Sequence, residues 1–201
     1  MDNLKPWLMA AEMMVPKDID LNLFINEKKM EKEFLEFSIK RFKEYKAMGD
    51  KTLEQLNDDE LHEAPNESSN SIAVIIQHLH GNMLSRWTNF LTEDGEKPWR
   101  LRDAEFEEQQ WSKEDILQKW SEGWQAILSS LESLQPADLL KEITIRSQPL
   151  LVIDAIIRQQ MHYSAHVGQI VYIGKWLKGK DWKTLSIPKG DSKKFNRQMG
   201  L

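Results

Sequence analysis

Residues 159–170 read QQMHYSAHVGQI and lie in the middle of a long apolar segment that contains no proline. His162 and His166 are four residues apart, so an α-helix would place both imidazoles on one face, one turn apart. The same helical stripe carries Ala155, Ile170 and Ile173. This stripe is therefore expected to face the protein interior, where polar groups without partners are costly. The geometry is the one that two ligands of a single metal ion require.

The H-x-x-x-H spacing by itself has two interpretations. The two imidazoles either bind one metal ion or are polar residues at a helix edge, hydrogen-bonded to their neighbours. The zinc-protease pattern H-E-x-x-H is absent, because Tyr163 stands where that pattern has glutamate. The chain has no cysteine, which excludes thiolate ligands, disulfides and cysteine nucleophiles. Any bound metal must therefore be held by nitrogen and oxygen atoms.

Length and charge limit the classes of function. The chain has 201 residues and a net charge of −5, which predicts one domain over residues 1–201, with an N-terminal arm at 1–20 and a C-terminal tail at 180–201. It has no block of basic residues, so nucleic acid is not an expected partner. No stretch reaches the roughly 18 apolar residues of a membrane span, and the N-terminus is a poor signal peptide. We therefore expect a cytoplasmic protein without a membrane partner.

The periodicity of apolar residues predicts an all-α fold. These residues recur at three- and four-residue steps in several segments, which is the pattern of amphipathic helices. The predicted long helices cover residues 23–48, 72–92, 112–134 and 149–177, and a shorter helix covers 52–62. Four long amphipathic helices with extended connections predict a four-helix bundle. Bundles of this kind often hold metal sites between facing helices.

Local signals set the expected helix ends. Gly49 and the aspartate after it are expected to end the first long helix, and Ser71 and Ser112 to cap the second and third. Residues 143–145 are predicted to form a short extended piece before the last helix, with Pro149 in the first turn of that helix.

The second long helix carries two further histidines, His78 and His80. Their phases differ by about 200°, so they point to different sides of the helix. His80 lies nearer the larger apolar face, so periodicity leaves open which of the two is the better third ligand. The polar residues nearest the histidine phases either orient a substrate or bond within the bundle; they are Asn82, Ser85 and Gln159.

The connection Glu93–Gln110 is long and dense in charges around Trp99. Long connections of this kind are often functional. The interpretation that we favour is structural, with Arg–Asp pairs fixing the segment to the body of the protein. His62 lies in an acidic stretch and is predicted to be a surface histidine.

Two stretches resemble the DinB/YfiT-like superfamily of bacterial metal-binding four-helix bundles. Residues 71–79, SIAVIIQHL, resemble the second-helix pattern of that superfamily, and residues 162–170, HYSAHVGQI, resemble its H-x-x-x-H-x-G-Q-I signature. The resemblance implies that one divalent metal ion is bound by His78, His162 and His166. It favours His78 over His80 only through position in the motif, and it also implies a homodimer.

The same resemblance suggests chemistry, because known members include bacillithiol and mycothiol S-transferases and a maleylpyruvate isomerase. Three imidazoles leave a divalent ion such as zinc or nickel with open positions. Our first hypothesis is a metal-dependent transferase that uses a low-molecular-weight thiol. A non-catalytic metal-binding stress or interaction protein and a metal-dependent hydrolase are the alternatives. The long connection over residues 93–110 and the C-terminal tail depart from the family pattern, so the identity of the substrate stays open.

Overall fold

The structure, a computed structural model, describes residues 21–200, with side chains from residue 29 onward. The predicted arm at 1–20 lies outside the described residues. The described chain is mostly helical, which confirms the predicted class, although it also contains a small two-stranded sheet. Within the described chain, no helix is both long enough and apolar enough to cross a membrane.

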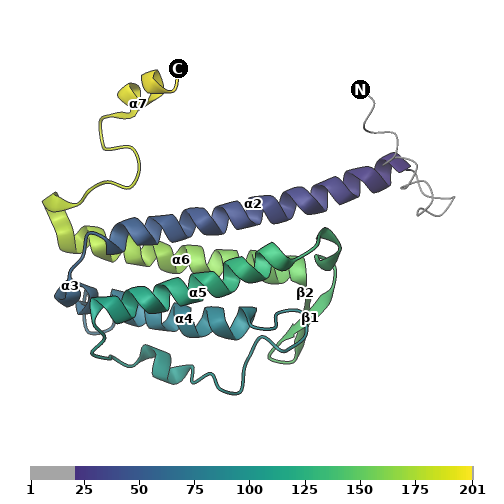
Figure 1. The fold of residues 1–201 in the computed structure, drawn as a ribbon. Coiled ribbons are helices and arrows are strands. Elements are labelled where there is room, and N and C mark those ends of the chain that lie inside the picture. Colours follow the sequence, from purple (N-terminus) through teal and green to yellow (C-terminus); the bar gives the residue numbers. More distant parts are fainter. Residues whose placement is uncertain (1–20, 201) are drawn as a thin grey trace.

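Four long helices lie side by side (Figure 1). Their bounds are α2 (Leu21–Leu53), α4 (Ile72–Trp87), α5 (Lys113–Ser133) and α6 (Val152–Lys178). Helix α2 contacts α5 and α6, and α4 contacts the same two helices from the other side. The apolar stripes of all four helices therefore face one core. The shorter elements are α3 (Asp58–His62), α7 (Ser192–Gln198) and three 3-10 helices, η1 (Asp103–Phe106), η2 (Pro136–Asp138) and η3 (Gly179–Asp181).

Large aromatic side chains fill the core between α4 and α6. Trp87, Trp124 and Tyr163 are fully buried. The Trp87 indole N–H donates to the Tyr163 hydroxyl at 3.0 Å, and that hydroxyl donates to Asn82 Oδ1, also at 3.0 Å. Buried tyrosine and tryptophan usually find such partners for their polar tips. This chain of bonds fixes the position of α6 relative to α4, the two helices that carry the histidines.

Helix α2 continues to Leu53, so the prediction that it ends at Gly49 is wrong. A Cβ atom on Gly49 would lie 2.2 Å from the Trp120 ring of α5, so glycine here makes room for that ring. The next residue, Asp50, accepts a hydrogen bond of 2.7 Å from Trp120 Nε1. Packing between α2 and α5 therefore explains a Gly-Asp pair that sequence patterns associate with a helix end.

Helix α4 begins as predicted, with the Ser71 side chain accepting a hydrogen bond from the Val74 backbone N–H. It ends at Trp87, before the predicted end at residue 92. Asn89 has a φ of +50°, a left-handed conformation that asparagine tolerates and a helix does not continue through. Helix α5 has the predicted cap, in which Ser112 and Asp115 bond reciprocally.

A β-hairpin precedes α6 and corrects the predicted start of the last helix. Strand β1 (Glu142–Ile145) pairs antiparallel with β2 (Gln148–Leu151), so Pro149 lies in a strand and α6 begins at Val152. The two turn residues, Arg146 and Ser147, both have positive φ, as a two-residue hairpin turn requires. Their backbone N–H groups donate to the Asp94 carboxylate at 2.8 and 2.7 Å, which holds this unusual turn against the connection after α4.

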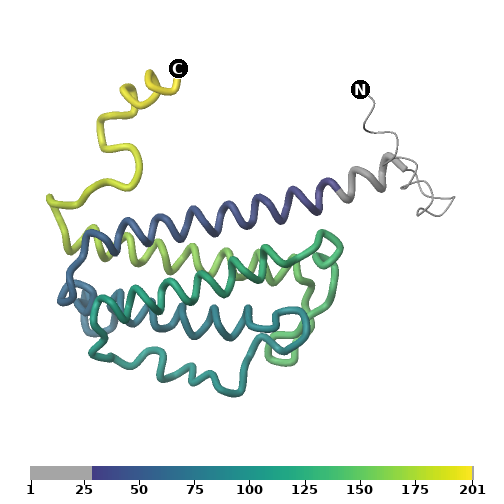
Figure 2. Tube along the Cα trace, viewed as in Figure 1, coloured from purple at the N-terminus to yellow at the C-terminus, as the bar shows by residue number. Residues whose placement is uncertain are grey.

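The segment after α6 leaves the body of the protein, and α7 lies away from the four helices (Figures 1 and 2). Helix α6 ends at Lys178, one residue beyond the predicted end at 177, and Gly179 after it has a φ of +50°. Trp182 is half-buried and packs near Gly174. Phe195 on α7 is exposed.

Candidate metal centre

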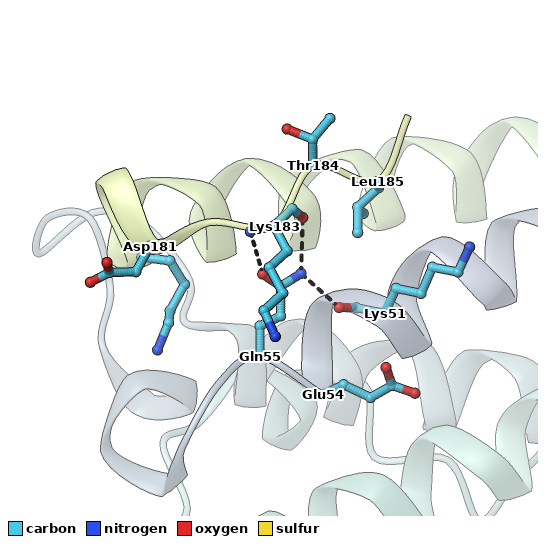
Figure 3. Close-up of a pocket in the computed structure, with 8 residues that line it drawn as sticks. Lys51, Glu54, Gln55, Asp181, Lys183, Thr184 and Leu185 are labelled. Atoms are coloured by element: carbon cyan, nitrogen blue, oxygen red, sulfur yellow. Dashed lines mark hydrogen bonds between the residues drawn. The ribbon is translucent and has the colours of Figure 1, made fainter. Parts of the chain in front are cut away.

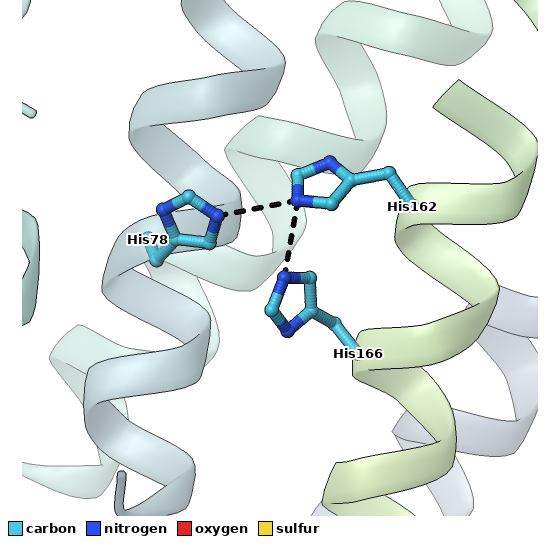
Figure 4. Close-up of side chains that lie close together, drawn as sticks. All are labelled: His78, His162 and His166. Atoms are coloured by element: carbon cyan, nitrogen blue, oxygen red, sulfur yellow. Dashed lines mark hydrogen bonds between the residues drawn. The ribbon is translucent and has the colours of Figure 1, made fainter. Parts of the chain in front are cut away.

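Three imidazole nitrogens from two helices converge at one point between α4 and α6 (Figure 4). His78 comes from α4, and His162 and His166 come from successive turns of α6. His162 Nε2 lies 3.3 Å from His78 Nε2 and 3.1 Å from His166 Nε2. Two nitrogens bound to a tetrahedral zinc ion at about 2.0–2.1 Å would lie about 3.3–3.4 Å apart. These three residues can therefore hold a metal ion.

Hydrogen bonds on the far side of two rings indicate which nitrogens carry a lone pair. His78 Nδ1 lies 2.9 Å from a Glu105 oxygen, and His166 Nδ1 lies 2.8 Å from Gln169 Oε1. Carboxylate and amide oxygens accept hydrogen bonds, so each Nδ1 donates and each Nε2 of a neutral ring keeps its lone pair. His162 Nε2 carries at most one hydrogen, so it can donate to the Nε2 atom of either His78 or His166, and its contact with the other Nε2 then brings two lone pairs together. A cation bound by all three Nε2 atoms removes this unfavourable contact.

The environment also favours the neutral form of the rings on α6. Burial, together with the neighbouring His166 and His78, lowers the pKa of His162 to about 3. Burial likewise lowers the pKa of His166. Metal ions bind imidazoles in the neutral form. Both α6 histidines are thus ready to bind a metal at neutral pH.

The connection between α4 and α5 holds His78 in place. Glu105, in η1, is buried and is bonded by Arg100 through Nε at 2.7 Å and Nη2 at 2.8 Å. Burial alone would raise the pKa of Glu105, but the hydrogen bonds from Arg100 and His78 outweigh it and lower the pKa. The Phe106 ring stacks on His78 with centroids 4.7 Å apart. A carboxylate that fixes the tautomer and orientation of a ligating histidine is usual around metal sites.

Gly81 makes room for this carboxylate on the surface of α4. A Cβ atom at this position would lie 2.2 Å from Glu105 Oε1 and 2.8 Å from its Cδ. Because Arg100 and His78 hold that carboxylate, we expect Gly81→Ala to displace it and to weaken zinc binding by about 10–100-fold, as loss of an outer partner does. Competition with a chromogenic chelator measures this affinity.

Gly168→Ala is the matched control, because nothing lies within 4 Å of a Cβ atom at that α6 position. Its zinc affinity should not change, and its stability should rise slightly, since alanine is the better helix former. Equal zinc affinities in the two alanine variants would contradict the role given to Glu105.

The other histidines lie outside this group. His80 Nε2 pairs with Glu122 at 2.9 Å, and the His80 side chain is more exposed than that of His78, although it lies nearer the larger apolar face of the helix. His62 is half-buried, with its Nε2 2.7 Å from the Trp111 carbonyl oxygen, so it is not the free surface histidine that its acidic neighbours predicted. Asp58 and Asp59 of α3 are exposed, while the His62 ring turns toward Trp111.

The polar residues predicted near the histidines divide into two groups. Asn82 and Gln159 line a cavity beside His78 and His162. Ser85 is buried and donates to the Gly95 carbonyl oxygen at 2.7 Å, which is a structural bond.

Metal binding by the three convergent histidines stays a prediction.

Ion pairs do fix the connection to the body, but the main partners are glutamates. Arg86 pairs with Glu96 at 3.0 Å and Arg100 with Glu105 at 2.7 Å. An Arg–Asp pair of the predicted kind joins exposed Arg102 to Asp103, with 3.9 Å between them. Sequence reasoning missed Glu105 and Phe106 as neighbours of the site, because their contacts depend on how the connection folds back over α4.

A separate cavity lies between the end of α2 and residues 178–185 (Figure 3). Its volume is about 740 Å³, and its lining includes charges of both signs. Gln55 crosses it with bonds to Lys51 and Lys183. Lys178, in its lining, is twelve residues or about 18 Å along α6 from His166. This cavity therefore takes no part in the histidine group.

Comparison with known proteins gives a family and no further relative. Searches of curated proteins and of solved structures found no match. One family, described as "Protein of unknown function (DUF1572)", matches residues 29–191. The match covers α4, α5, α6 and the connection that carries Glu105. The chain therefore belongs to the DUF1572 family of proteins of unknown function.

Proposed function

We propose that this chain is a divalent-metal-dependent enzyme with a four-helix bundle of the DinB type, and that it transfers a low-molecular-weight thiol to an electrophile. The observation that carries the proposal is the convergence of the His78, His162 and His166 Nε2 atoms, with two of the rings oriented by acceptors at Nδ1. Zinc or nickel suits three nitrogen ligands. Such an ion would keep open positions and lower the pKa of a bound thiol or water.

The chain's own residues would bind and orient the reactants. The absence of cysteine means that any thiolate at the site belongs to the ligand, with no protein thiol to compete. Asn82 Oδ1 is held by the Tyr163 hydroxyl, so the amide is fixed with its NH2 group available to a ligand in the adjacent cavity. Gln159 lines the same cavity and is buried. These groups lie beside His162, where a substrate would meet the thiol.

A thiol-transfer assay tests the proposal. We expect zinc- or nickel-loaded protein to accelerate the reaction of a low-molecular-weight thiol with monochlorobimane, and the His162→Ala variant to lose this rate. Removal of one metal ligand deprives the site of its ion, so the loss should be at least about 100-fold. The His80→Ala variant is the control, since His80 lies outside the group and pairs with Glu122.

The alternatives give different results in the same experiments. Ester or amide cleavage that needs the metal but no thiol would replace the transferase proposal with a hydrolase. No turnover with any thiol, together with a lower melting temperature after chelation, would indicate a metal that only ties α4 to α6. The homodimer that the family resemblance implies stays a prediction. An exposed apolar stripe along α6 is compatible with it and consists of Ile157, Met161, Ala165, Tyr172 and Trp176.

A further inference from the structure

A second cavity, of about 240 Å³, opens beside the convergent histidines. His78 and His162 form part of its wall. Five of its nine lining residues are arginines, contributed by α4, the connection, the hairpin turn and α6: Arg86, Arg100, Arg102, Arg146 and Arg158. Four segments far apart in the sequence thus bring guanidinium groups to one small space. None of the described residues that line this cavity is acidic.

Two of these arginines form a fixed, buried floor. Arg86 is held by Glu96, at 3.0 Å, and by the Gly95 carbonyl oxygen. Arg100 is held by both oxygens of Glu105, so its plane cannot rotate freely. Arg100 Nη1 is buried and has no hydrogen-bond partner in the described part of the chain, and a Glu96 carboxylate oxygen lies 3.8 Å from it. One donor therefore remains for a ligand.

The other three arginines are exposed at the rim. Arg146 shares Glu96 with Arg86, at 2.8 Å. Arg102 lies 3.9 Å from the exposed carboxylate of Asp103 and over the Phe106 ring. Arg158 forms no ion pair within residues 29–200. The guanidinium groups thus outnumber the carboxylates that contact them, although the chain as a whole carries a charge of −5.

The cavity also contains a buried polar group without a partner. Gln159 is 3% exposed, and its Oε1 atom has no hydrogen-bond partner among the described residues. Buried amide oxygens are nearly always bonded, and leaving one unpaired is costly. Rotation of the amide lets Gln159 either accept from a hydroxyl or donate to an anionic oxygen. Together with Arg100 Nη1, it marks the cavity as a binding site for a polar ligand.

We propose that this cavity binds a small oxyanion, the carboxylate or phosphate group by which a substrate is held beside the three histidines. Guanidinium groups match both anions through paired hydrogen bonds. The volume lies below the roughly 300–1,000 Å³ of pockets for drug-sized ligands, so the bound group is small. The charges are gathered in a cavity instead of along a surface stripe, which suits a small molecule and not a nucleic-acid backbone. The assignment of the anion as part of a substrate rests on the proposed function.

Anion binding by metal-free protein tests this proposal separately from the metal. Metal is removed by passage over a chelating resin, because a soluble chelator is itself a polycarboxylate. Calorimetric titration with malonate and with inorganic phosphate, at low ionic strength, should give one saturable site per chain for at least one of them. The anion that binds with the higher affinity shows whether the site prefers carboxylate or phosphate. Chloride at the same concentrations should not produce this heat.

Variants at the rim decide whether the binding occurs in this cavity. In the Arg146→Ala/Arg158→Ala double variant we expect affinity for the preferred anion to fall at least tenfold, since both guanidinium groups can donate charge-assisted hydrogen bonds to it. Both side chains are exposed, so the fold should be preserved, and circular dichroism checks this. The Arg41→Ala/Arg197→Ala variant removes the same charge elsewhere and should bind as the unaltered protein does.

The outcomes separate this proposal from the proposed function. If neither anion binds, or if both double variants bind alike, the cavity is not an anion site, whatever the metal does. If the anion binds with the expected dependence on the rim arginines and thiol transfer is absent, the cavity assignment stands and the transferase proposal fails.

Discussion

His162→Ala is expected to abolish the stabilisation of the protein by zinc. His162 Nε2 is the atom that lies 3.3 and 3.1 Å from the other two ligand nitrogens, so its loss removes the centre of the group. Loss of an outer-shell partner alone costs about 10–100-fold in metal affinity, and loss of a ligand should cost more. At a zinc concentration of about 100 times the Kd, binding stabilises the folded state by about 2.7 kcal/mol. In the variant the same zinc concentration should contribute less than about 0.4 kcal/mol.

Thermal unfolding with and without zinc measures this difference. For a chain of this length 1 kcal/mol corresponds to roughly 2–4 °C, so zinc should raise the melting temperature of the unaltered protein by about 5–10 °C and that of the variant by little. His80→Ala should keep the full rise, because the ring of His80 pairs with Glu122 on α5. A rise that persists in His162→Ala would place the metal somewhere else.

Glu105→Ala is expected to produce the largest loss of stability in the metal-free protein. The substitution leaves the Arg100 guanidinium buried, with 1% of its side chain exposed, and without its two hydrogen bonds to a carboxylate. Removing one partner of a buried ion pair costs about 3–5 kcal/mol. The Glu96 carboxylate, 3.8 Å from Arg100 Nη1, should keep the loss toward the lower end. Urea unfolding of metal-free protein gives the value.

Two further variants isolate the cause. Glu105→Gln keeps an oxygen that can accept from Arg100, so it should lose less stability than Glu105→Ala while still weakening zinc binding through His78. Asp103→Ala removes a fully exposed carboxylate from the same 3-10 helix and should change stability by less than about 0.5 kcal/mol. Equal losses in Asp103→Ala and Glu105→Ala would show that η1 as a whole, and not the buried carboxylate, determines stability.

Patterns within single helices predicted much of this molecule correctly. The four long helices exist, and the apolar residues on the stripe of His162 and His166 are buried: Ala155, Ile170 and Ile173. Two of the errors in helix ends arose where contacts with another element outweighed a local signal. Gly49 leaves space for the Trp120 ring to pack against α2. Pro149 lies in a hairpin, and Asp94, from a segment distant in the sequence, accepts hydrogen bonds from the turn of that hairpin.

The surroundings of the histidines were much less accessible to sequence reasoning. Nothing in the spacing of Glu105 and His78 indicates that they meet, because they are 27 residues apart and separated by an irregular connection. The choice of His78 over His80 came from family resemblance, because periodicity left it open. Gly81 offers the one local signal, a glycine inside a helix beside two histidines, and close approach by another segment explains it.

X-ray absorption at the zinc edge, on protein loaded with one equivalent of zinc, tests the central claim most directly. The claim is that three imidazoles from α4 and α6 hold one ion. It predicts a first shell dominated by nitrogen at about 2.0–2.1 Å, with the outer-shell scattering of about three imidazole rings. A shell of oxygen atoms without imidazole scattering, or protein that retains no zinc after gel filtration, would contradict it.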